Sequence, residues 1–586
     1  MDLLRTTENK PWKGRGKRGK EIEYLRDVCL LDFDEKLNWT LCLNGERETG
    51  TDWRPLKGLL SGITSVKEKR RRNKELKRRL VVWTKQLSLI ETYIRILIGE
   101  ADINRIEKFR EGHYETITME IANNHFEFRN FELLSGETIE ELKKTYKWTD
   151  KDNIDTMLAF LEMRQEQGFE DWVQLRYTLA NSSLKLFYND FTEEELEEMK
   201  LEQLKRSLPL ALAQFYEKAG KAGIISYSKD NAEQLLYGVR GFDINEAYGS
   251  QFVRGDDFPL SRPYKVDGKE LSSLIKEDRW FFLVMKSEVK IEEMPRWLTP
   301  YIREIGKGEV KEIEGYYYFF EKYDYKVLKL LGLSLNSFKE SGWRIYALYT
   351  CDQVGYLNKS FRAAIVNKYN RRKELKKIGD PAEKMIKAQL KFLYGKGLSK
   401  RTFTDAEDYF QRNFYKTSYV NEVISFHALA RNRYEIMSMM KRLNFDYVSV
   451  DTDGIKSSCR GARRLFAERN KEIKALNEKA GFKDTKIGLW KYEGYYRYFI
   501  QFSNKVYAYE DGGKLICKFA GCLEKAWREY FKNKTITQAF IELSFSDIKI
   551  PGGIIRRSLQ VDENKQFYIK KESYSYGING IDELEG

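Results

Sequence analysis

The stretch YVSVDTDGIKS, residues 447–457, constrains the fold of this chain more than any other. Apolar, β-favouring residues stand on both sides of a short polar segment, which predicts a strand, a tight turn and a second strand. The turn carries two carboxylates, Asp451 and Asp453. Crowded carboxylates raise one another's pKa unless a divalent cation neutralises them. A solvated acidic turn would show the same residues, so the turn alone leaves the metal-binding and the solvated interpretations open.

The overall charge is basic, with 103 Lys and Arg residues against 89 Asp and Glu residues and a formal net charge of +14. Such a surplus favours a polyanionic partner, although it also serves solubility in a chain of 586 residues. Six cysteines without a C-x-x-C pair and three histidines argue against a zinc site or a disulfide framework. The sequence has no run of about eighteen apolar residues and no signal-peptide core, so we expect a soluble, cytoplasmic protein that does not enter a membrane.

The N-terminal third predicts a basic flexible arm followed by an α/β domain. Residues 1–20 are polar and basic, as in a solvated tail or a nucleic-acid-binding arm. Strands are predicted over 28–34 and 77–87, and a helix after Thr138, which Glu141 follows at capping-box spacing. A helical stretch then ends near the sequence GKAG, which predicts a domain boundary there.

The central part combines acid-tipped strands with basic helices. An apolar strand delivers Asp243 at its end, and aromatic-rich strands follow within 270–350. Residues 359–377 and 381–400 predict two basic helices, which are most often solvated but here lie between two acid-tipped strands. Two-metal phosphoryl transfer requires carboxylates that bridge two cations and cationic side chains that bind a triphosphate. The order of these features favours the metal-binding interpretation of the acidic turn. Beyond it, 486–576 is predicted to be rich in strands.

Six short motifs occur in a fixed order between residues 243 and 553. They are DINEAYG (243–249), KAQLKFLYG (387–395), VDTDG (450–454), KIGLWKYE (486–493), KVY (505–507) and PGG (551–553). In this order they resemble motifs A, B and C, the segment with a metal-site acid, the K-x-Y motif and the thumb turn of protein-primed family B DNA polymerases. The resemblance covers the chain from about residue 220 to about residue 570.

The resemblance implies an α+β multidomain fold, in which an RNase H-like α/β exonuclease-type domain precedes a right hand of palm, fingers and thumb. The implied parts are the basic arm (1–20), a degenerate exonuclease-like domain (21–205), the palm (206–270 and 419–499), an insertion resembling terminal-protein region 1 (271–350), the fingers (351–396), a short insertion resembling terminal-protein region 2 (397–418), the thumb (500–575) and a tail (576–586).

The resemblance also implies a DNA-directed DNA polymerase that adds dNTPs to a 3′-hydroxyl with two Mg²⁺ ions, or Mn²⁺ in their place. Asp243, Asp451 and Asp453 would be the catalytic acids. The metal ligands would be Asp243, Asp451, Glu493 and the carbonyl oxygen of Ile244.

The same motifs imply residues that bind the substrates. Arg372 and Lys387 would bind the triphosphate, and Tyr394 would stack near the incoming base. Tyr248 would lie under the sugar and leave no space for a 2′-hydroxyl. Lys505 and Tyr507 would hold the primer terminus.

The exonuclease motifs depart from the family pattern. Such a site needs three or four carboxylates to hold two metal ions. Asp32 and Asp34 resemble the first motif, with its Glu shortened to Asp. The acid of the second motif has become Ile90, with Glu91 beside it, and the third motif falls at Glu202. We therefore expect a fold that is retained with weak or absent proofreading.

The polymerase motifs depart as well. Lys391 and Phe392 stand where the family has Asn-Ser near the nascent base pair. The template-binding turn keeps Gly223 but loses its tyrosine. The segment 397–418 is short for the hairpin that encircles DNA in this family, which predicts weaker strand displacement and processivity.

The expected partners are a DNA primer-template, dNTPs and, by resemblance, a terminal protein that supplies the first primer hydroxyl; we expect a monomer. Two alternatives stay open. The altered motif B and template turn are also compatible with a template-independent or repair-type nucleotidyltransferase. A non-catalytic DNA-binding derivative is the other, and the intact Asp243, Asp451 and Asp453 argue against it.

Overall fold

The structure is a computed structural model in which the chain divides into two compact units, the first formed by Met1–Thr192 and Arg371–Phe392 and the second by Glu193–Asn370 and Leu393–Gly586. None of the described helices is long and apolar enough to cross a membrane. The structure describes residues 12–15, 21–34, 36, 38–43, 46–51, 77–85, 87, 90, 102–108, 114–121, 124–166, 179–219, 223–228, 230–287, 316–334, 340, 342–398, 419–519, 524–545, 548–550, 553–561 and 567–575.

The first unit is built on a mixed sheet. Its described strands follow the order β4-β3-β2-β5-β8-β7-β6, with β1 paired to β2. The β2–β5 and β5–β8 pairs are parallel and the others antiparallel. The strands predicted over 28–34 and 77–87 are confirmed. The strands are β1 (Trp12–Arg15), β2 (Glu21–Phe33), β3 (Trp39–Leu43), β4 (Glu46–Gly50), β5 (Lys77–Thr84), β6 (Asp102–Lys108), β7 (Tyr114–Ile121) and β8 (Asn124–Asn130).

Part of the N-terminal arm is a strand. We expected 1–20 to be flexible, but β1 pairs with β2 in register from Trp12 opposite Tyr24 to Arg15 opposite Glu21. The expectation is therefore wrong for residues 12–15. The charge composition did not indicate this pairing. Strands pair through backbone hydrogen bonds, which a basic segment can form as readily as an apolar one.

Helices of the first unit pack against this sheet. They are α3 (Phe131–Ser135), α4 (Ile139–Tyr146), α5 (Asn153–Glu166) and α6 (Leu179–Tyr188). Buried Val81 and Trp83 of β5 share one apolar cluster with Leu142 and Phe160. The predicted capping box at the start of α4 is confirmed, since the Thr138 Oγ1 accepts the Glu141 N–H at 3.2 Å and Glu141 accepts the Thr138 N–H at 2.9 Å.

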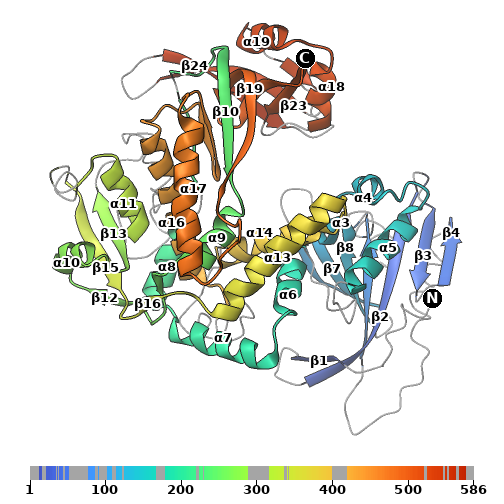
Figure 1. Ribbon diagram of the computed structural model, residues 1–586. Coiled ribbons are helices and arrows are strands. Elements are labelled where there is room, and N and C mark those ends of the chain that lie inside the picture. The colour runs from blue at the N-terminus through green and yellow to red at the C-terminus, as the bar shows by residue number, and fades with distance from the viewer. Residues whose placement is uncertain are drawn as a thin grey trace. The chain divides into compact units, whose positions relative to one another are not determined.

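The second unit contains an antiparallel sheet with the described order β21-β20-β19-β10-β18-β17-β9. Strands β10 and β19 pair from Leu236 opposite Phe499 to Ile244 opposite Trp490, and Figure 1 shows them as two long strands side by side. The prediction of a strand, a turn and a second strand at 447–457 is confirmed. The bounds are β9 (Ile225–Tyr227), β10 (Leu236–Ile244), β17 (Ser449–Asp451), β18 (Gly454–Ser457), β19 (Trp490–Ser503), β20 (Val506–Asp511) and β21 (Lys514–Phe519).

The aromatic-rich strands predicted within 270–350 form a separate four-stranded sheet of order β12-β15-β13-β14. The helix α16 (Glu422–Arg442) packs on this region through Ile436 and Met439, which share a core with Leu283 and Phe320. The remaining elements of this region are β11 (Phe258–Pro259), β12 (Tyr264–Val266), the 3₁₀ helix η3 (Gly268–Glu270), α10 (Leu271–Lys276), β13 (Phe281–Ser287), β14 (Tyr316–Glu321), α11 (Lys322–Leu330), β15 (Arg344–Thr350) and β16 (Val354–Gly355).

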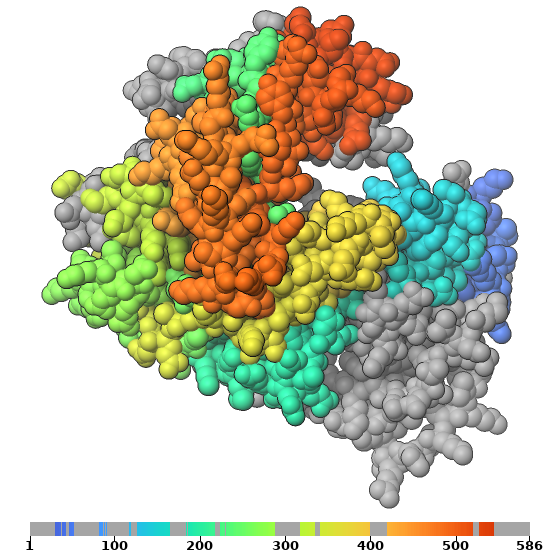
Figure 2. Space-filling view, viewed as in Figure 1, coloured from blue at the N-terminus to red at the C-terminus, as the bar shows by residue number. Residues whose placement is uncertain are grey.

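Further helices complete the described fold. The two predicted basic helices are confirmed as α13 and α14, but α18 and α19 interrupt the C-terminal region that we expected to be mostly strands. In the space-filling view, α17 forms part of the exposed face of the second unit (Figure 2). The bounds are α7 (Glu193–Lys205), α8 (Leu210–Lys218), α9 (Ala247–Arg254), α13 (Lys359–Ile378), α14 (Glu383–Gly397), α17 (Ala462–Lys479), α18 (Glu524–Phe531), α19 (Ile536–Phe545), β22 (Ile548–Ile550), β23 (Gly553–Val561) and β24 (Phe567–Ser575).

Candidate active site

The turn between β17 and β18 is held from two sides. The Thr452 N–H donates to the Ile224 carbonyl at 2.8 Å, and the Asn432 side chain on α16 donates to the Thr452 carbonyl at 2.9 Å. Thr452 has a φ of 61°, which is uncommon for a β-branched residue and costs roughly 1–3 kcal/mol. These contacts fix the backbone that carries Asp451 and Asp453.

Strand β10 brings Asp243 to the same turn. Asp243 is the register partner of Gly454, and the Ile244 N–H donates to the Asp453 carbonyl at 2.9 Å. A Cβ on Gly454 would lie 3.3 Å from the Phe242 carbonyl oxygen and 3.4 Å from the Asp243 Oδ1, so the turn and the Asp243 carboxylate are close neighbours. The three predicted catalytic acids are thus carried by neighbouring strands of one sheet.

Burial and the nearby negative charges raise the pKa values of two of these acids. Burial, with the charges of Asp453 and Glu493, raises the pKa of Asp243 to about 7. Burial, with the charges of Asp451 and Glu493, raises the pKa of Asp453 to about 6. Burial also lowers the pKa of Lys456 in spite of the surrounding acids. Such a cluster is stabilised by added positive charge at neutral pH.

A β-bulge presents Glu493 to this cluster. Gly241 faces Gly494, whereas the next residue, Phe242, faces Tyr492, so Glu493 is left without a register partner. An extra residue of this kind bends the strand and redirects its side chain. The charge of Glu493 raises the pKa of both Asp243 and Asp453, which is consistent with the predicted proximity to the acids.

Lysine side chains place positive charge beside the acidic cluster. The Lys505 Nζ lies 3.3 Å from the Asp451 Oδ1, and both side chains are less than half exposed, at 44% and 43%. The Lys456 Nζ lies 4.6 Å from the centre of the Tyr507 ring. Sequence reasoning identified Lys505 but missed Lys456, whose only signal was a cation on the strand that follows the acidic turn.

The carboxylates fit a divalent cation by donor type. Oxygen ligands are those that Mg²⁺ and Mn²⁺ prefer in proteins. In the part of the chain that the structure describes, however, no three His, Cys, Asp or Glu side chains form a ready metal-binding group. Asp451 is instead paired with Lys505 through its Oδ1, so a bound cation would compete with this lysine for the carboxylate.

Two tyrosines stack beside the acidic turn. The Tyr248 and Tyr394 rings are parallel, with centroids 3.8 Å apart and an interplanar angle of 0°. Burial raises the pKa of Tyr394 to about 12 and also raises that of Tyr248. A Cβ on Gly223 would lie 2.8 Å from the Thr452 Cγ2 and 3.2 Å from the Tyr248 hydroxyl. The structure therefore brings Gly223 and Tyr248 together at the turn.

The predicted triphosphate-binding cations belong to the first unit. The Arg372 Nε pairs with the Glu383 Oε2 at 3.2 Å, while Lys387 and Lys391 are exposed. In the same unit, the Lys384 Nζ lies 2.7 Å from the Glu137 Oε1. Arg372 and Lys384 are therefore already paired with acids, whereas Lys387 and Lys391 are exposed on α14.

In the first unit, an amide accompanies the predicted exonuclease acid Asp32. The Asn153 Nδ2 donates to the Asp32 Oδ2 at 2.9 Å, and the Lys143 Nζ donates to the Asn153 Oδ1 at 3.0 Å. Burial raises the pKa of Asp32. Asp34 accepts hydrogen bonds from the Lys36 N–H and from Asn38, as a turn carboxylate does.

Glu91 and Glu202, the remaining predicted exonuclease acids, are not among the described residues of the first unit. Glu202 lies on α7 in the second unit, where it accepts from the Asn358 side chain at 3.1 Å and from the Tyr419 hydroxyl at 2.5 Å. Ile90 is buried, and Glu91 lies outside the described residues. Sequence reasoning missed Asn153, whose signal was a polar run directly before a helix.

This chain resembles known proteins in its fold and not detectably in its sequence. No protein-family profile and no curated protein matches the sequence. Solved structures of phi29 DNA polymerase do match, each over 94% of this chain and 100% of that chain. The complex with primer-template DNA has 13% identity and a TM-score of 0.58, that with single-stranded DNA 14% and 0.56, and that with primer-template DNA and incoming nucleotides 12% and 0.55. The chain therefore has the α+β multidomain fold of that polymerase, as predicted.

Proposed function

We propose that this chain is a DNA-directed DNA polymerase that adds deoxynucleotides to a 3′-hydroxyl. The observation that carries the proposal is the convergence of Asp243 and the Asp451–Asp453 turn on adjoining strands. This arrangement occurs in a chain that shares the phi29 DNA polymerase fold over 94% of its length. In this proposal the sheet around β10 is the palm, α13 and α14 are the fingers, and the region after 500 is the thumb.

Two Mg²⁺ ions are the proposed cofactor, with Mn²⁺ as a substitute. Asp243, Asp451, Glu493 and the Ile244 carbonyl oxygen would hold them. When bound, the ions would supply the positive charge that phosphoryl transfer needs. Support comes from the raised pKa values of Asp243 and Asp453, because acids that are costly to ionise alone are natural cation ligands.

The side chains around the acids have proposed roles toward the substrates. Lys505 and Tyr507 hold the primer terminus, and Tyr248 excludes a 2′-hydroxyl beneath the sugar. The ring of Tyr394, already stacked on Tyr248, packs near the incoming base. The triphosphate is bound by Arg372 and Lys387, and DNA by Lys391 and Gly223.

Primer extension tests the proposal. A labelled primer is incubated with dNTPs and Mg²⁺, with and without template, using wild type, Asp451→Ala and Asp446→Ala. Asp446 is an exposed carboxylate shortly before the turn and serves as the matched control. We expect template-dependent extension by wild type and Asp446→Ala, and a loss of roughly a hundredfold to a thousandfold in Asp451→Ala, the range for removal of one preorganised electrostatic group. Extension without template would indicate a template-independent nucleotidyltransferase, and none at all a DNA-binding derivative.

We further propose that the exonuclease-type domain has little or no nuclease activity. Asp32 is accompanied by the Asn153 amide, and buried Ile90 stands where the second motif would carry an acid. An amide lacks the negative charge with which a carboxylate balances a bound metal ion. Priming by a terminal-protein hydroxyl, with docking through 271–350, stays a prediction from the resemblance.

A further inference from the structure

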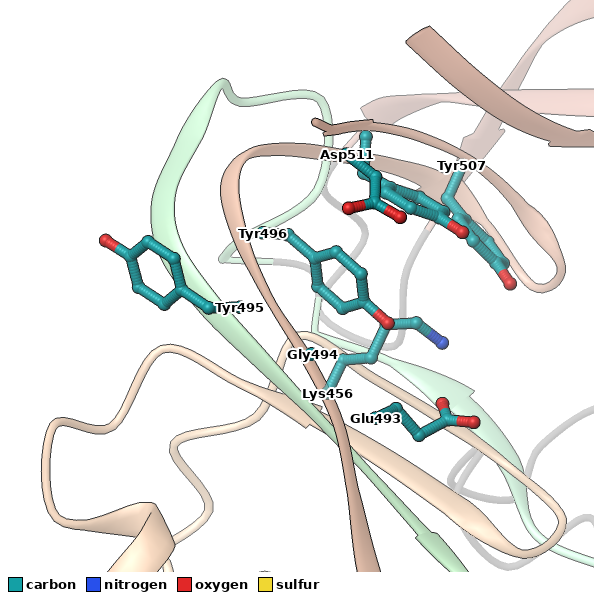
Figure 3. Close-up of a pocket in the computed structure, with 8 residues that line it drawn as sticks. Lys456, Glu493, Gly494, Tyr495, Tyr496, Tyr507 and Asp511 are labelled. Atoms are coloured by element: carbon teal, nitrogen blue, oxygen red, sulfur yellow. The ribbon is translucent and has the colours of Figure 1, made fainter. Parts of the chain in front are cut away.

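The second unit contains a cavity of about 340 Å³ beside the acidic cluster (Figure 3). This volume is at the lower end of the range for small-ligand sites, roughly 300–1,000 Å³. The cavity lies over β18, β19 and β20, and the side chains that give it its character are Lys456, Glu493, Tyr496, Tyr507, Tyr509 and Asp511. Its size suits one flat ring system with a few polar substituents.

Three tyrosine rings give the cavity aromatic walls. The Tyr496 and Tyr509 centroids are 4.5 Å apart, and the Tyr507 and Tyr509 rings are nearly parallel, with an interplanar angle of 23°. Tyr495 also borders the cavity, but Figure 3 shows its ring on the opposite side of the strand from Tyr496. The cavity therefore offers tyrosine hydroxyl groups to an entering ligand, while the Lys456 Nζ lies over the Tyr507 ring at 4.6 Å and Phe499 stacks on that ring with centroids 5.5 Å apart.

Glycine makes room for one of these walls. A Cβ on Gly241 would lie 2.9 Å from the Tyr496 hydroxyl and 3.1 Å from its Cε2. Gly241 pairs with Gly494, next to the bulge at Glu493. The same irregularity that presents Glu493 to the acidic cluster thus allows the Tyr496 ring to lie across β10.

The charged side chains that line the cavity indicate which class of ligand it can bind. Glu493 and Asp511 contribute two carboxylates, against one ammonium from Lys456. In Figure 3 the Glu493 carboxylate and the Lys456 ammonium point to the same side. A net negative lining repels phosphate groups, whereas carboxylates and tyrosine hydroxyls accept hydrogen bonds from ring amino groups. The lining therefore fits an uncharged nucleobase whose phosphate stays outside, rather than a free nucleoside triphosphate.

The position of the cavity indicates which nucleobase would enter. Tyr507 lines it and is two residues from Lys505, whose Nζ lies 3.3 Å from the Asp451 Oδ1. We propose that the cavity binds the unpaired 3′-terminal base of a primer. The inference rests on the proposed function, which brings the primer terminus to Lys505 and Tyr507. A terminal base that is not paired to the template then leaves the duplex and takes the place of the Lys456 ammonium over the Tyr507 ring.

Binding assays test this inference without dNTPs. Dissociation constants are measured for primer-templates with a matched and a mismatched 3′-terminal base, and their ratio is compared among variants. Tyr509→Leu removes one stacking face, Tyr509→Phe keeps it, and Tyr237→Leu alters an exposed tyrosine of β10 outside the cavity. We expect Tyr509→Leu to weaken mismatched binding at least about fivefold more than matched binding, the lower limit for loss of one base–aromatic stack. The other two variants should keep the wild-type ratio.

A crosslinking experiment on wild type removes any dependence on the folding of variants. A 4-thiothymidine placed at a mismatched 3′ end should crosslink within 490–511, and the same base in a matched end should not. An unchanged ratio in folded Tyr509→Leu, or crosslinks only outside this segment, would overturn the inference. Extension of the matched primer by wild type is measured in parallel. If extension occurs, these results concern the cavity alone; if it does not, the proposed function fails and this inference fails with it.

Discussion

Individual residues at the candidate active site have strained backbones. Glu246, Thr452 and Lys505 all have positive φ values, of 53°, 61° and 60°. Such angles are uncommon outside glycine, asparagine and aspartate, and they persist only where the surroundings enforce them. At Thr452 the enforcing contacts are the hydrogen bonds with Ile224 and Asn432. The position of the acidic turn therefore depends on its neighbours as much as on its own sequence.

Gly223→Ala tests that dependence. The new Cβ would lie 2.8 Å from the Thr452 Cγ2 and 3.2 Å from the Tyr248 hydroxyl, so the turn or the tyrosine has to shift. We expect a destabilisation of about 1–3 kcal/mol, typical of overpacking, and primer extension lowered by at least roughly tenfold. Steady-state extension and thermal unfolding measure the two effects.

The matched control for this substitution is Gly461→Ala. Gly461 has a φ of −81°, and a Cβ there would come no closer than 3.9 Å to the Cys459 Sγ. This variant should extend primers as wild type does. Equal activity of Gly223→Ala and wild type would mean that the turn accepts the methyl group and is not fixed as described.

Among the elements, α16 combines an apolar core face with buried ionic contacts. His427 lies between Glu321, at 2.6 Å from its Nδ1, and Asp257, at 3.2 Å from its Nε2. Arg431 and Lys322 also contact Asp257, and the Arg433 Nη1 lies 2.8 Å from the Asp324 Oδ1. Buried charges of this kind are costly unless they are paired, so the helix can dock in only one register.

This cluster predicts a pH-dependent stability. Burial disfavours the imidazolium form of His427, but the charges of Glu321 and Asp257 outweigh burial and raise the pKa of His427. A raised histidine pKa contributes stability in full below the ordinary value, near 6.5, and that contribution is lost as pH rises through the folded-state value. The pKa of Asp257 is held well below its usual range, so Asp257 stays ionised in this window.

We therefore expect the melting temperature of wild type to fall between pH 6 and pH 9 by more than that of His427→Gln. At pH 6 the substitution should destabilise the protein by on the order of 3 kcal/mol, as expected for breaking a buried ion pair. Ser438→Ala, on the same helix, changes no titratable group and should keep the wild-type pH profile. Parallel profiles for wild type and His427→Gln would show that folding leaves the pKa of His427 unchanged, which would contradict the prediction.

At the scale of the whole molecule, the two units differ in the side chains that surround their predicted catalytic acids. In the second unit Asp243, Asp451 and Asp453 converge, whereas in the first Asp32 accepts a hydrogen bond from the Asn153 amide and the nearby Asp152 is paired with Arg47. We expect wild type to leave a 3′-mismatched primer intact over a period in which it extends a matched one. Gel analysis of the labelled primer measures this. Mismatch removal that is lost in Asp32→Asn would contradict the prediction.

Local patterns in the sequence predicted much of this architecture. The capping box at Thr138, the β17–β18 hairpin and the basic helices α13 and α14 follow from short-range rules, and all are confirmed. The helices α18 and α19 were missed because both contain aromatic residues, and α19 also β-branched ones, which favour strands. The pairing of β1 with β2 was missed because it depends on backbone hydrogen bonds that composition does not reveal.

For the candidate site, the acids were predictable and their neighbours were not. Asp243, Asp451 and Asp453 stand in short motifs. The contact between Asn153 and Asp32 joins residues 121 positions apart, which no local pattern encodes. The bulge that frees Glu493 depends on the register of β10 against β19, and a register is a property of two strands together.

The ion pair between Lys505 and Asp451 makes the lysine a resident counter-ion. A divalent cation that binds Asp451 would compete with this ammonium for the carboxylate, and where it displaces the ammonium its binding is an exchange of one positive charge for another. The released ammonium then needs a new anion, and a primer phosphate is the one that the proposed function supplies. Cation and primer would each favour the binding of the other, and thermodynamic linkage makes this cooperativity equal in both directions.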